Sequence, residues 1–274
     1  MAILIVFLLG LVVGSFLNCL IYRLETNQSF VFGRSRCPNC QHPLSGRDLI
    51  PVLSFIFLGG KCRYCQKKIS WQYPLVEIST ALIFLLIFNY QFLIFNQFPI
   101  FNFIYLLFVS SCLIVIFVFD LKHYLIPDEV LYPAIIVTVL YRVSDCLKIG
   151  VWDLLGHWSL VIGNLKTLFN PLVSAFVAGL LFLAIYLITR GRGMGFGDVK
   201  LAFLMGLFLG FPKIVVAVFF AFLAGALIGL TLILLRKKTL KSQLPFAPFL
   251  VLGTFFALFF GQQIINYYLN LVFF

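Results

Sequence analysis

The chain has 274 residues, of which 62% are hydrophobic and only 11% are charged. A soluble domain carries about 25% charged residues, so this composition excludes an ordinary soluble protein and indicates one that crosses a membrane several times. The formal net charge of +11 would suit a nucleic-acid binder, but its distribution along the chain indicates the membrane instead.

Long apolar segments predict eight membrane helices. In chain order they cover residues 1–22, 74–95, 100–119, 129–145, 171–189, 199–211, 213–235 and 245–272. About 20 apolar residues cross the 30 Å of hydrocarbon in a bilayer. The first segment has no charge before Arg23, which favours an uncleaved helix over a secretory signal. The sixth is too short to span alone and is interrupted by Pro212, so it predicts a short tilted helix or half of a broken one.

The basic residues predict the topology. With the N-terminus outside, sixteen of the twenty Lys and Arg residues lie in the loops 23–73, 120–128, 190–200 and 236–244, all on one side. The positive-inside rule makes that side cytoplasmic. The positive charge is then explained by topology and by contact with membrane lipid, and no nucleic-acid partner is expected.

These observations predict an all-α polytopic membrane protein in three parts. A first transmembrane helix covers residues 1–22, a small cytoplasmic domain covers 23–73, and a transmembrane domain covers 74–274.

The cytoplasmic domain contains two C-x2-C pairs separated by 21 residues, formed by Cys37 with Cys40 and Cys62 with Cys65. That separation is slightly longer than the usual 15–20 residues of a paired zinc motif. Four thiolates are suitable ligands for tetrahedral Zn²⁺, and they leave no open position for catalysis, so a structural site is expected. The reducing cytosol disfavours disulfides, and four unrelated cysteines are the alternative.

Two acidic residues lie at one expected membrane depth. Asp120 ends the third apolar segment, and Asp198 opens the sixth after the sequence GMGFG. Acids at helix ends that extend toward water are one interpretation. The other is a catalytic pair that shares one proton, in which the ionised carboxyl activates water and the protonated one polarises a peptide carbonyl. Gly195 and Gly197 would permit close approach of backbone and substrate, and Lys200 would pair with Asp198 or extend toward the interface.

Five motifs in the same order resemble those of bacterial prepilin peptidases, the type IV leader peptidases of the GxGD aspartyl class. They are GSFLNCLIYRL from Gly14, the four-cysteine segment from Cys37 to Glu77, FDLKHYLIPD from Phe119, GMGFGDVKLAFLMGLFLG from Gly193 and LPFAPFLVLG from Leu244. The last motif has Ala247 where glycine is commoner in the family.

The resemblance implies both an activity and its residues. Asp120 and Asp198 match the catalytic pair, Asp128 matches the acid of the family's PD element, and the four cysteines match the zinc ligands. Members with this cysteine segment commonly cleave the leader peptide of type IV pilin-like precursors at the cytoplasmic face of the bacterial inner membrane. They then methylate the new N-terminal residue with S-adenosylmethionine.

Two alternatives remain open at this point. One is a peptidase without methyltransferase activity, because the chain has no Rossmann-type glycine fingerprint and the residues that bind the methyl donor are not visible. The other is a non-enzymatic transporter or scaffold with a zinc-bound loop. A transporter would place its acids near the midplane of the membrane, and here both lie toward one face.

Overall fold

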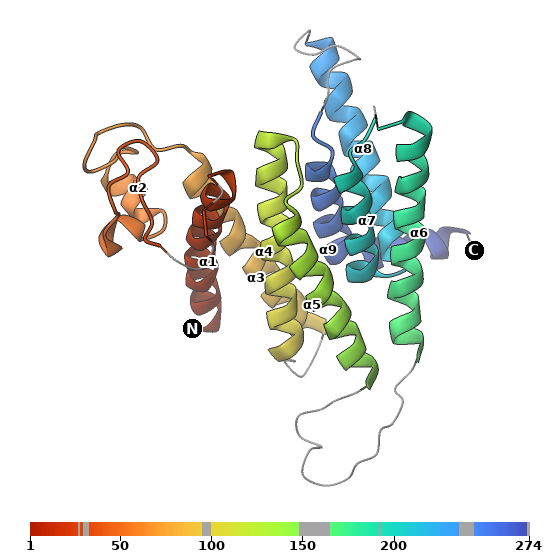
Figure 1. Ribbon diagram of the computed structural model, residues 1–274. Helices are drawn as coiled ribbons and strands as arrows, with labels where there is room; N and C mark the ends of the chain where they lie inside the picture. The colour runs from red at the N-terminus through yellow and green to blue at the C-terminus, as the bar shows by residue number, and fades with distance from the viewer. Residues whose placement is uncertain are drawn as a thin grey trace. The chain divides into compact units, whose positions relative to one another are not determined.

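The structure of the protein is a computed structural model that describes residues 1–26, 28–29, 33–94, 100–147, 165–191, 193–235 and 244–272. Within these ranges the chain is helical, with two isolated β-bridges and no extended strand. The helices are α1 (Ala2–Glu25), a 3-10 turn η1 (Gly46–Leu49), α2 (Leu53–Phe57), α3 (Gln72–Ile94), α4 (Ile100–His123), α5 (Asp128–Leu147), α6 (Leu165–Thr189), α7 (Phe196–Leu209), α8 (Lys213–Leu234) and α9 (Ala247–Val272) (Figure 1).

Each of the eight predicted apolar segments forms a helix, which confirms the predicted fold class. Six of these helices, α1, α3, α4, α6, α8 and α9, are long and apolar enough to cross a membrane. The other two are α5, which has acidic residues in its first turn, and α7, whose 14 residues span only about 21 Å. The prediction of a short sixth helix is therefore confirmed, and α7 ends where Gly210 adopts a φ of +68°.

Two helices begin three or more residues before the predicted apolar segment. Helix α6 begins at Leu165 instead of residue 171, because Pro171 lies inside the helix instead of starting it. Helix α7 begins at Phe196 instead of residue 199, because Gly195 is its N-cap residue and the first turn contains Gly197 and Asp198.

The chain forms two compact units, Met1–Val115 and Ile116–Phe274. In the first unit, α1 and α3 pack together through Gly10 and Gly14 of α1. A Cβ atom added at Gly10 would lie 2.5 Å from the Cα of Ala81, and one at Gly14 would lie 2.6 Å from the Cα of Glu77. Glycines spaced by four residues thus let the two backbones approach closely, as in other membrane helix pairs. The expected domain boundaries at residues 22 and 73 separate membrane segments from a cytoplasmic segment, whereas the two compact units are separated by their internal contacts. The expected boundaries therefore stay a prediction.

The second unit uses the same device in two helix pairs. Helices α6 and α7 meet where Gly206 contacts the backbone of Ala175, and α8 and α9 meet where Gly253 contacts the backbone of Ala217. Because α7 holds one of the two candidate catalytic acids, the close fit of Gly206 against α6 also fixes the position of that acid.

We expect Gly206→Ala to lower the midpoint of thermal unfolding, measured in detergent by circular dichroism. The added Cβ would overlap the backbone of Ser174 and Ala175, and overpacking of this kind costs about 1–3 kcal/mol. The matched control is Gly229→Ala in α8, where the nearest neighbour of a new Cβ is the side-chain tip of Leu244 at 3.6 Å. A midpoint that falls equally in both variants would contradict the packing role of Gly206.

Candidate active site and metal centre

Asp120 lies near the C-terminal end of α4, in the second unit. Asp120 is only 5% exposed, and its Oδ2 atom has no hydrogen-bond partner within the described part of the chain. The backbone N–H of Ala247, the first residue of α9, faces its carboxyl group. The N-terminus of a helix carries partial positive charge, so α9 supplies an electrostatic partner for the ionised form of Asp120.

Asp198 is the third residue of α7 and is 8% exposed. Its Oδ2 atom accepts a hydrogen bond of 3.1 Å from the backbone N–H of Gly195, which closes the first turn of the helix. The carboxyl groups of Asp198 and Asp120 are near enough for their charges to interact. The structure therefore brings the two acids together, and among the described residues neither one is paired with a basic side chain.

The two glycines before Asp198 have separate roles in this turn. Gly195 donates the hydrogen bond that caps α7, so its contribution is its backbone N–H. Gly197 packs against the segment before α5, and a Cβ atom at this residue would lie 3.1 Å from the Cβ of Ile126. Gly197 thus permits a close approach between α7 and the segment before α5. The sequence had suggested a close approach between the backbone and the substrate.

Lys200 does not pair with Asp198, so that expectation is wrong. Its Nζ atom lies 2.8 and 2.9 Å from the two carboxylate oxygens of Asp128. It also lies over the rings of Tyr132 and Phe196, at 5.1 and 5.5 Å from their centroids. Lys200 therefore joins the N-terminal part of α7 to the first turn of α5, and Asp198 has no basic partner among the residues that the structure describes.

The C-terminal end of α7 is held by Arg142, whose partners are not evident from the sequence. Its Nε donates to the carbonyl of Leu207 at 3.1 Å, and its Nη2 donates to the carbonyl of Phe208 at 2.6 Å. The last carbonyls of a helix have no partner within the helix, and they carry partial negative charge. The signal in the sequence that could have identified Arg142 is the presence of a basic residue within an apolar segment. Helix α5 thus holds α7 at both ends.

We expect Arg142→Met to lower the free energy of unfolding by about 1.5–3 kcal/mol, because carbonyls of α7 lose charge-assisted hydrogen bonds. Arg142→Lys keeps the charge but loses the planar pair of donors, so we expect an intermediate loss. Thermal unfolding in detergent measures both. Equal stability of Arg142→Met and the unsubstituted protein would show that Arg142 does not hold α7.

In the first unit, the two C-x2-C pairs form two turns of the same shape. Each turn is followed by a glutamine with positive φ, Gln41 at 56° and Gln66 at 58°. Equivalent backbone hydrogen bonds close both turns: Cys37 N–H to His42 O, Gln41 N–H to Cys37 O, Cys62 N–H to Lys67 O and Gln66 N–H to Cys62 O. The sequences CPNCQ and CRYCQ therefore behave as a structural repeat.

The four sulfur atoms fit a metal ion. They all lie within 4.8 Å of one another, and the Sγ atoms of Cys37 and Cys65 are 3.9 Å apart. A tetrahedron with Zn–S bonds of 2.3 Å has edges of about 3.8 Å. Burial would raise the pKa of Cys37, but hydrogen bonds from the backbone of Cys40 and Asn39 lower this pKa to about 7. A hydrogen bond from the backbone of Lys67 would lower the pKa of Cys65, but burial and hydrogen bonds with the other three cysteines raise it to about 11. The thiolate form of Cys37 is therefore accessible near neutral pH, whereas Cys65 would lose its proton on binding the metal.

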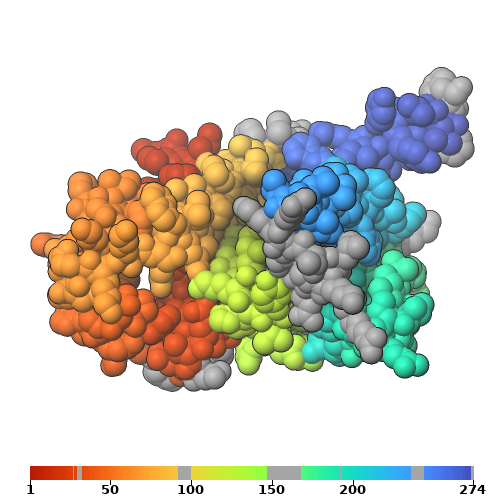
Figure 2. Space-filling model, turned by 90° about the horizontal axis from the view of Figure 1, so that it is seen from above, coloured from red at the N-terminus to blue at the C-terminus, as the bar shows by residue number. Residues whose placement is uncertain are grey.

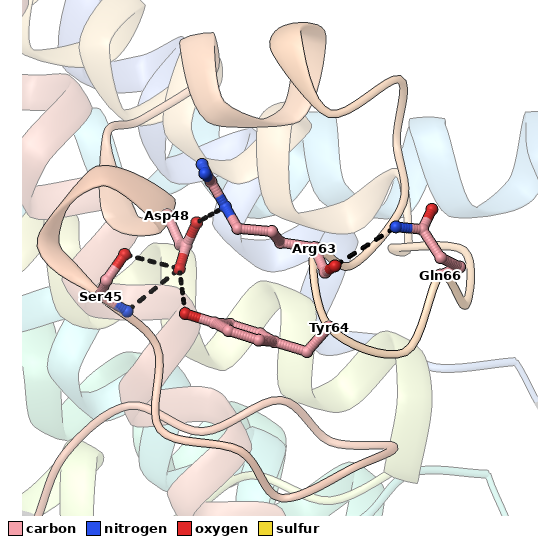
Figure 3. Close-up of polar contacts among 5 residues, drawn as sticks. All are labelled: Ser45, Asp48, Arg63, Tyr64 and Gln66. Carbon is pink, nitrogen blue, oxygen red and sulfur yellow. Dashed lines mark hydrogen bonds and ion pairs between the residues drawn. The ribbon is translucent and has the colours of Figure 1, made fainter.

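Asp48 connects the linker between the two turns to the second turn (Figure 3). Its carboxylate accepts hydrogen bonds from Ser45 N–H at 3.1 Å and Oγ at 2.7 Å, from Arg63 Nε at 2.8 Å and from Tyr64 OH at 3.3 Å. Burial opposes ionisation of Asp48, but the hydrogen bonds from Ser45 and Arg63 hold its pKa below the usual value. The ionised carboxylate of Asp48 therefore stabilises the folded domain at pH values above the ordinary pKa of an aspartate. This stabilisation is lost as the pH falls through the lowered pKa of Asp48.

Comparison with known proteins assigns the chain to a family. Residues 8–92 match the bacterial peptidase A24 N-terminal domain, and residues 107–230 match the type IV leader peptidase family. A prepilin leader peptidase/N-methyltransferase of Bacillus subtilis (strain 168) is 33% identical over 267 residues, which are 97% of this chain and 98% of that protein. This chain belongs to the type IV leader peptidase family.

Further members of the type IV leader peptidase family align over nearly their whole length. A prepilin leader peptidase/N-methyltransferase of Aeromonas salmonicida (strain A449) is 30% identical over 98% of this chain and 94% of its own. One from Pseudomonas aeruginosa PAO1 is 27% identical over 96% and 92%. No solved structure matches the chain significantly. The four cysteines lie in the first matched region, and Asp120 and Asp198 lie in the second.

Proposed function

We propose that this leader peptidase cleaves the leader peptide from type IV pilin-like precursors at the cytoplasmic face of the bacterial inner membrane, and that it methylates the new N-terminal residue. Membership of the family supports both activities, since its named relatives are prepilin leader peptidases and N-methyltransferases. The observation that carries the peptidase assignment is the meeting of two buried carboxyl groups, Asp120 and Asp198, without a basic partner among the described residues.

In the proposed cleavage, the two carboxyl groups share one proton and one negative charge. The ionised carboxyl accepts a proton from water, and the oxygen of that water attacks the carbonyl carbon of the scissile peptide bond. The protonated carboxyl donates its proton to the carbonyl oxygen. Collapse of the tetrahedral intermediate breaks the C–N bond, and a proton passes to the leaving amine. The unpartnered Oδ2 of Asp120 is the oxygen that we assign to the attacking water.

The expected position of the dyad suits this substrate. A pilin-like precursor has a basic leader followed by an apolar helix, and the cleaved bond lies between them. Asp120 lies near the end of α4 and Asp198 in the first turn of α7, next to loops that the positive-inside rule assigns to the cytoplasm. These helix ends favour the cytoplasmic boundary over the midplane sites that transporters use. The transporter and scaffold alternatives are therefore not favoured.

The four-cysteine segment is proposed to bind one structural Zn²⁺. Its sulfur geometry supports this proposal, and four thiolates complete a tetrahedral shell. S-adenosylmethionine would supply the methyl group, which passes from its sulfonium to the free amine of the new N-terminus as that amine loses a proton. We assign none of the described residues to the methyl donor.

The test is intact-mass spectrometry of a purified pilin precursor after incubation with the protein in detergent, with and without S-adenosylmethionine. The proposal predicts loss of the leader in both reactions and one added methyl group only with the donor. Loss of the leader without methylation, in a preparation that does not bind the donor, would leave a peptidase alone. An unchanged mass with several authentic precursors would contradict the proposed function.

A further inference from the structure

The segment between the two cysteine turns exposes an apolar face. Three residues of the short helix α2, Leu53, Ile56 and Phe57, are exposed, and Phe57 is 83% exposed. Their spacing of i, i+3 and i+4 places them on one side of the helix. Ile50 before the helix and Trp71 before α3 are also exposed, Trp71 by 71%. An apolar stripe on a small polar domain marks a binding surface.

This face is an ordered part of the fold. Phe55 of α2 is half-buried, with its ring centroid 5.1 Å from that of Trp71 and its edge against Gly60. Val52 at the N-cap of α2 has a φ of +59°, a conformation that β-branched residues rarely adopt. Its backbone N–H is held at 2.7 Å by Oε2 of Glu77. The hydrogen bond from Val52 to Glu77 therefore stabilises a strained backbone conformation at the start of α2 and fixes the helix in this position.

The contact with Glu77 fixes the level of α2 along helix α3. Glu77 is the sixth residue of α3, so it lies about 7.5 Å along the helix from its start. The neighbouring residues Leu75 and Ile78 of α3 are exposed apolar side chains of a membrane-spanning helix, where lipid is their natural solvent. Amphipathic helices in the interface are buried by about 5–10 Å into the boundary between headgroups and acyl chains. If α3 enters the membrane at its first turn, α2 lies at the level of this boundary.

The net charge of the segment that contains this face indicates the kind of surface that it fits. Between residues 33 and 71 every Lys and Arg is exposed: Arg34, Arg36, Arg47, Lys61, Arg63, Lys67 and Lys68. The same range contains one acidic residue, Asp48, and its carboxylate is already paired with Arg63. Figure 2 shows this part of the chain, in orange, at the molecular surface. An apolar stripe and an exposed tryptophan on a small domain with an excess of exposed basic residues are typical of a segment that lies in an anionic lipid surface.

We propose that α2 is an in-plane membrane anchor, which inserts Ile56 and Phe57 into the anionic leaflet and holds the four-cysteine domain against the bilayer next to the start of α3. Continuity with the membrane-spanning helix α3 and the excess of basic residues favour lipid as the occupant over a protein partner. The proposal does not depend on peptidase activity, because it concerns the position of the domain alone.

Photocrosslinking of the full-length, zinc-loaded protein in lipid nanodiscs tests the anchor. A p-benzoylphenylalanine is placed at Phe57 in one variant, at Ile56 in a second, and at the exposed Asn39 of the first cysteine turn as the control. We expect lipid adducts at residues 56 and 57, at least fivefold above residue 39. We also expect their yield to rise severalfold when phosphatidylglycerol replaces part of the phosphatidylcholine.

Three outcomes would overturn the anchor. One is adducts at residues 56 and 57 that join them to another segment of the protein. Another is lipid labelling as strong at residue 39 as at residue 57. The third is a lipid yield that does not change with phosphatidylglycerol content. Zinc content and thermal unfolding of each variant show that its domain is folded, so low labelling of a folded variant counts against the proposal.

Discussion

Replacing either Asp120 or Asp198 with asparagine is expected to slow cleavage of a pilin precursor by about 10²–10⁴-fold, because an amide can neither accept the proton of water nor share one with its partner. Each change removes a charge but keeps the shape of the side chain, so folding is expected to survive. The measurement is the single-turnover rate of leader loss, followed by mass spectrometry at saturating enzyme.

Asp145→Asn is the matched control for the dyad variants. Asp145 is an exposed acid of α5, so the same chemical change at this residue is expected to leave the rate of cleavage unchanged. Thermal unfolding of all three variants separates loss of chemistry from loss of folding. Full cleavage by a folded Asp120→Asn or Asp198→Asn protein would contradict the catalytic assignment.

The double change Cys62→Ser and Cys65→Ser is expected to abolish zinc binding, from one equivalent per chain to none. Structural zinc sites contribute folding free energy directly, so the segment from residue 33 to residue 71 would lose its ordered turns. We expect methylation to fall by more than tenfold, because the resemblance to the family implies that members with the four-cysteine segment are the ones that also methylate. Leader cleavage would fall much less, since Asp120 and Asp198 lie in the other compact unit.

Metal content by plasma mass spectrometry and product mass are measured on the same preparations. The control is Cys112→Ala, which removes a buried lone cysteine of α4 that belongs to no metal cluster of the described chain. Unchanged zinc content in the double variant would refute the metal site. A fall in cleavage as steep as the fall in methylation would refute the separation of the two activities.

Much of the fold is local in the sequence and was predictable. Long apolar runs predict helices because membrane spans must satisfy their own backbone hydrogen bonds, and each of the eight runs forms a helix. The cysteine cluster was also predictable from a local pattern, because a C-x2-C pair supplies half of the ligands of a metal site within four residues. The similarity of the two cysteine turns has a signal in the sequence, because a glutamine follows each C-x2-C pair, Gln41 after Cys40 and Gln66 after Cys65.

The rest depends on partners far apart in the chain. Lys200 pairs with Asp128, 72 residues away, and Arg142 reaches carbonyls of α7 about 65 residues away. Spacing along one helix cannot reveal such contacts, so the sequence alone predicts neither the partner of Lys200 nor that of Arg142. The approach of Ala247 to Asp120 is a third case, because only the three-dimensional fold of the second unit brings the N-terminus of α9 to that acid.

Helix α2 was missed for a different reason. Its five residues lie within a block that is polar overall, and an apolar run of this length is too short to predict a membrane span. Only the contact between Val52 and Glu77 shows that this run lies beside the start of a membrane helix.

The central claim is that Asp120 and Asp198 activate a water molecule, and a single-turnover cleavage in H₂¹⁸O tests it most directly. The new C-terminal carboxylate of the released leader peptide is analysed by mass spectrometry after one turnover. Attack by activated water predicts one ¹⁸O atom in that carboxylate for every bond cleaved. A leader that carries only ¹⁶O after the first turnover would show that an enzyme carboxylate attacks the peptide directly, and it would contradict the proposed chemistry of the pair.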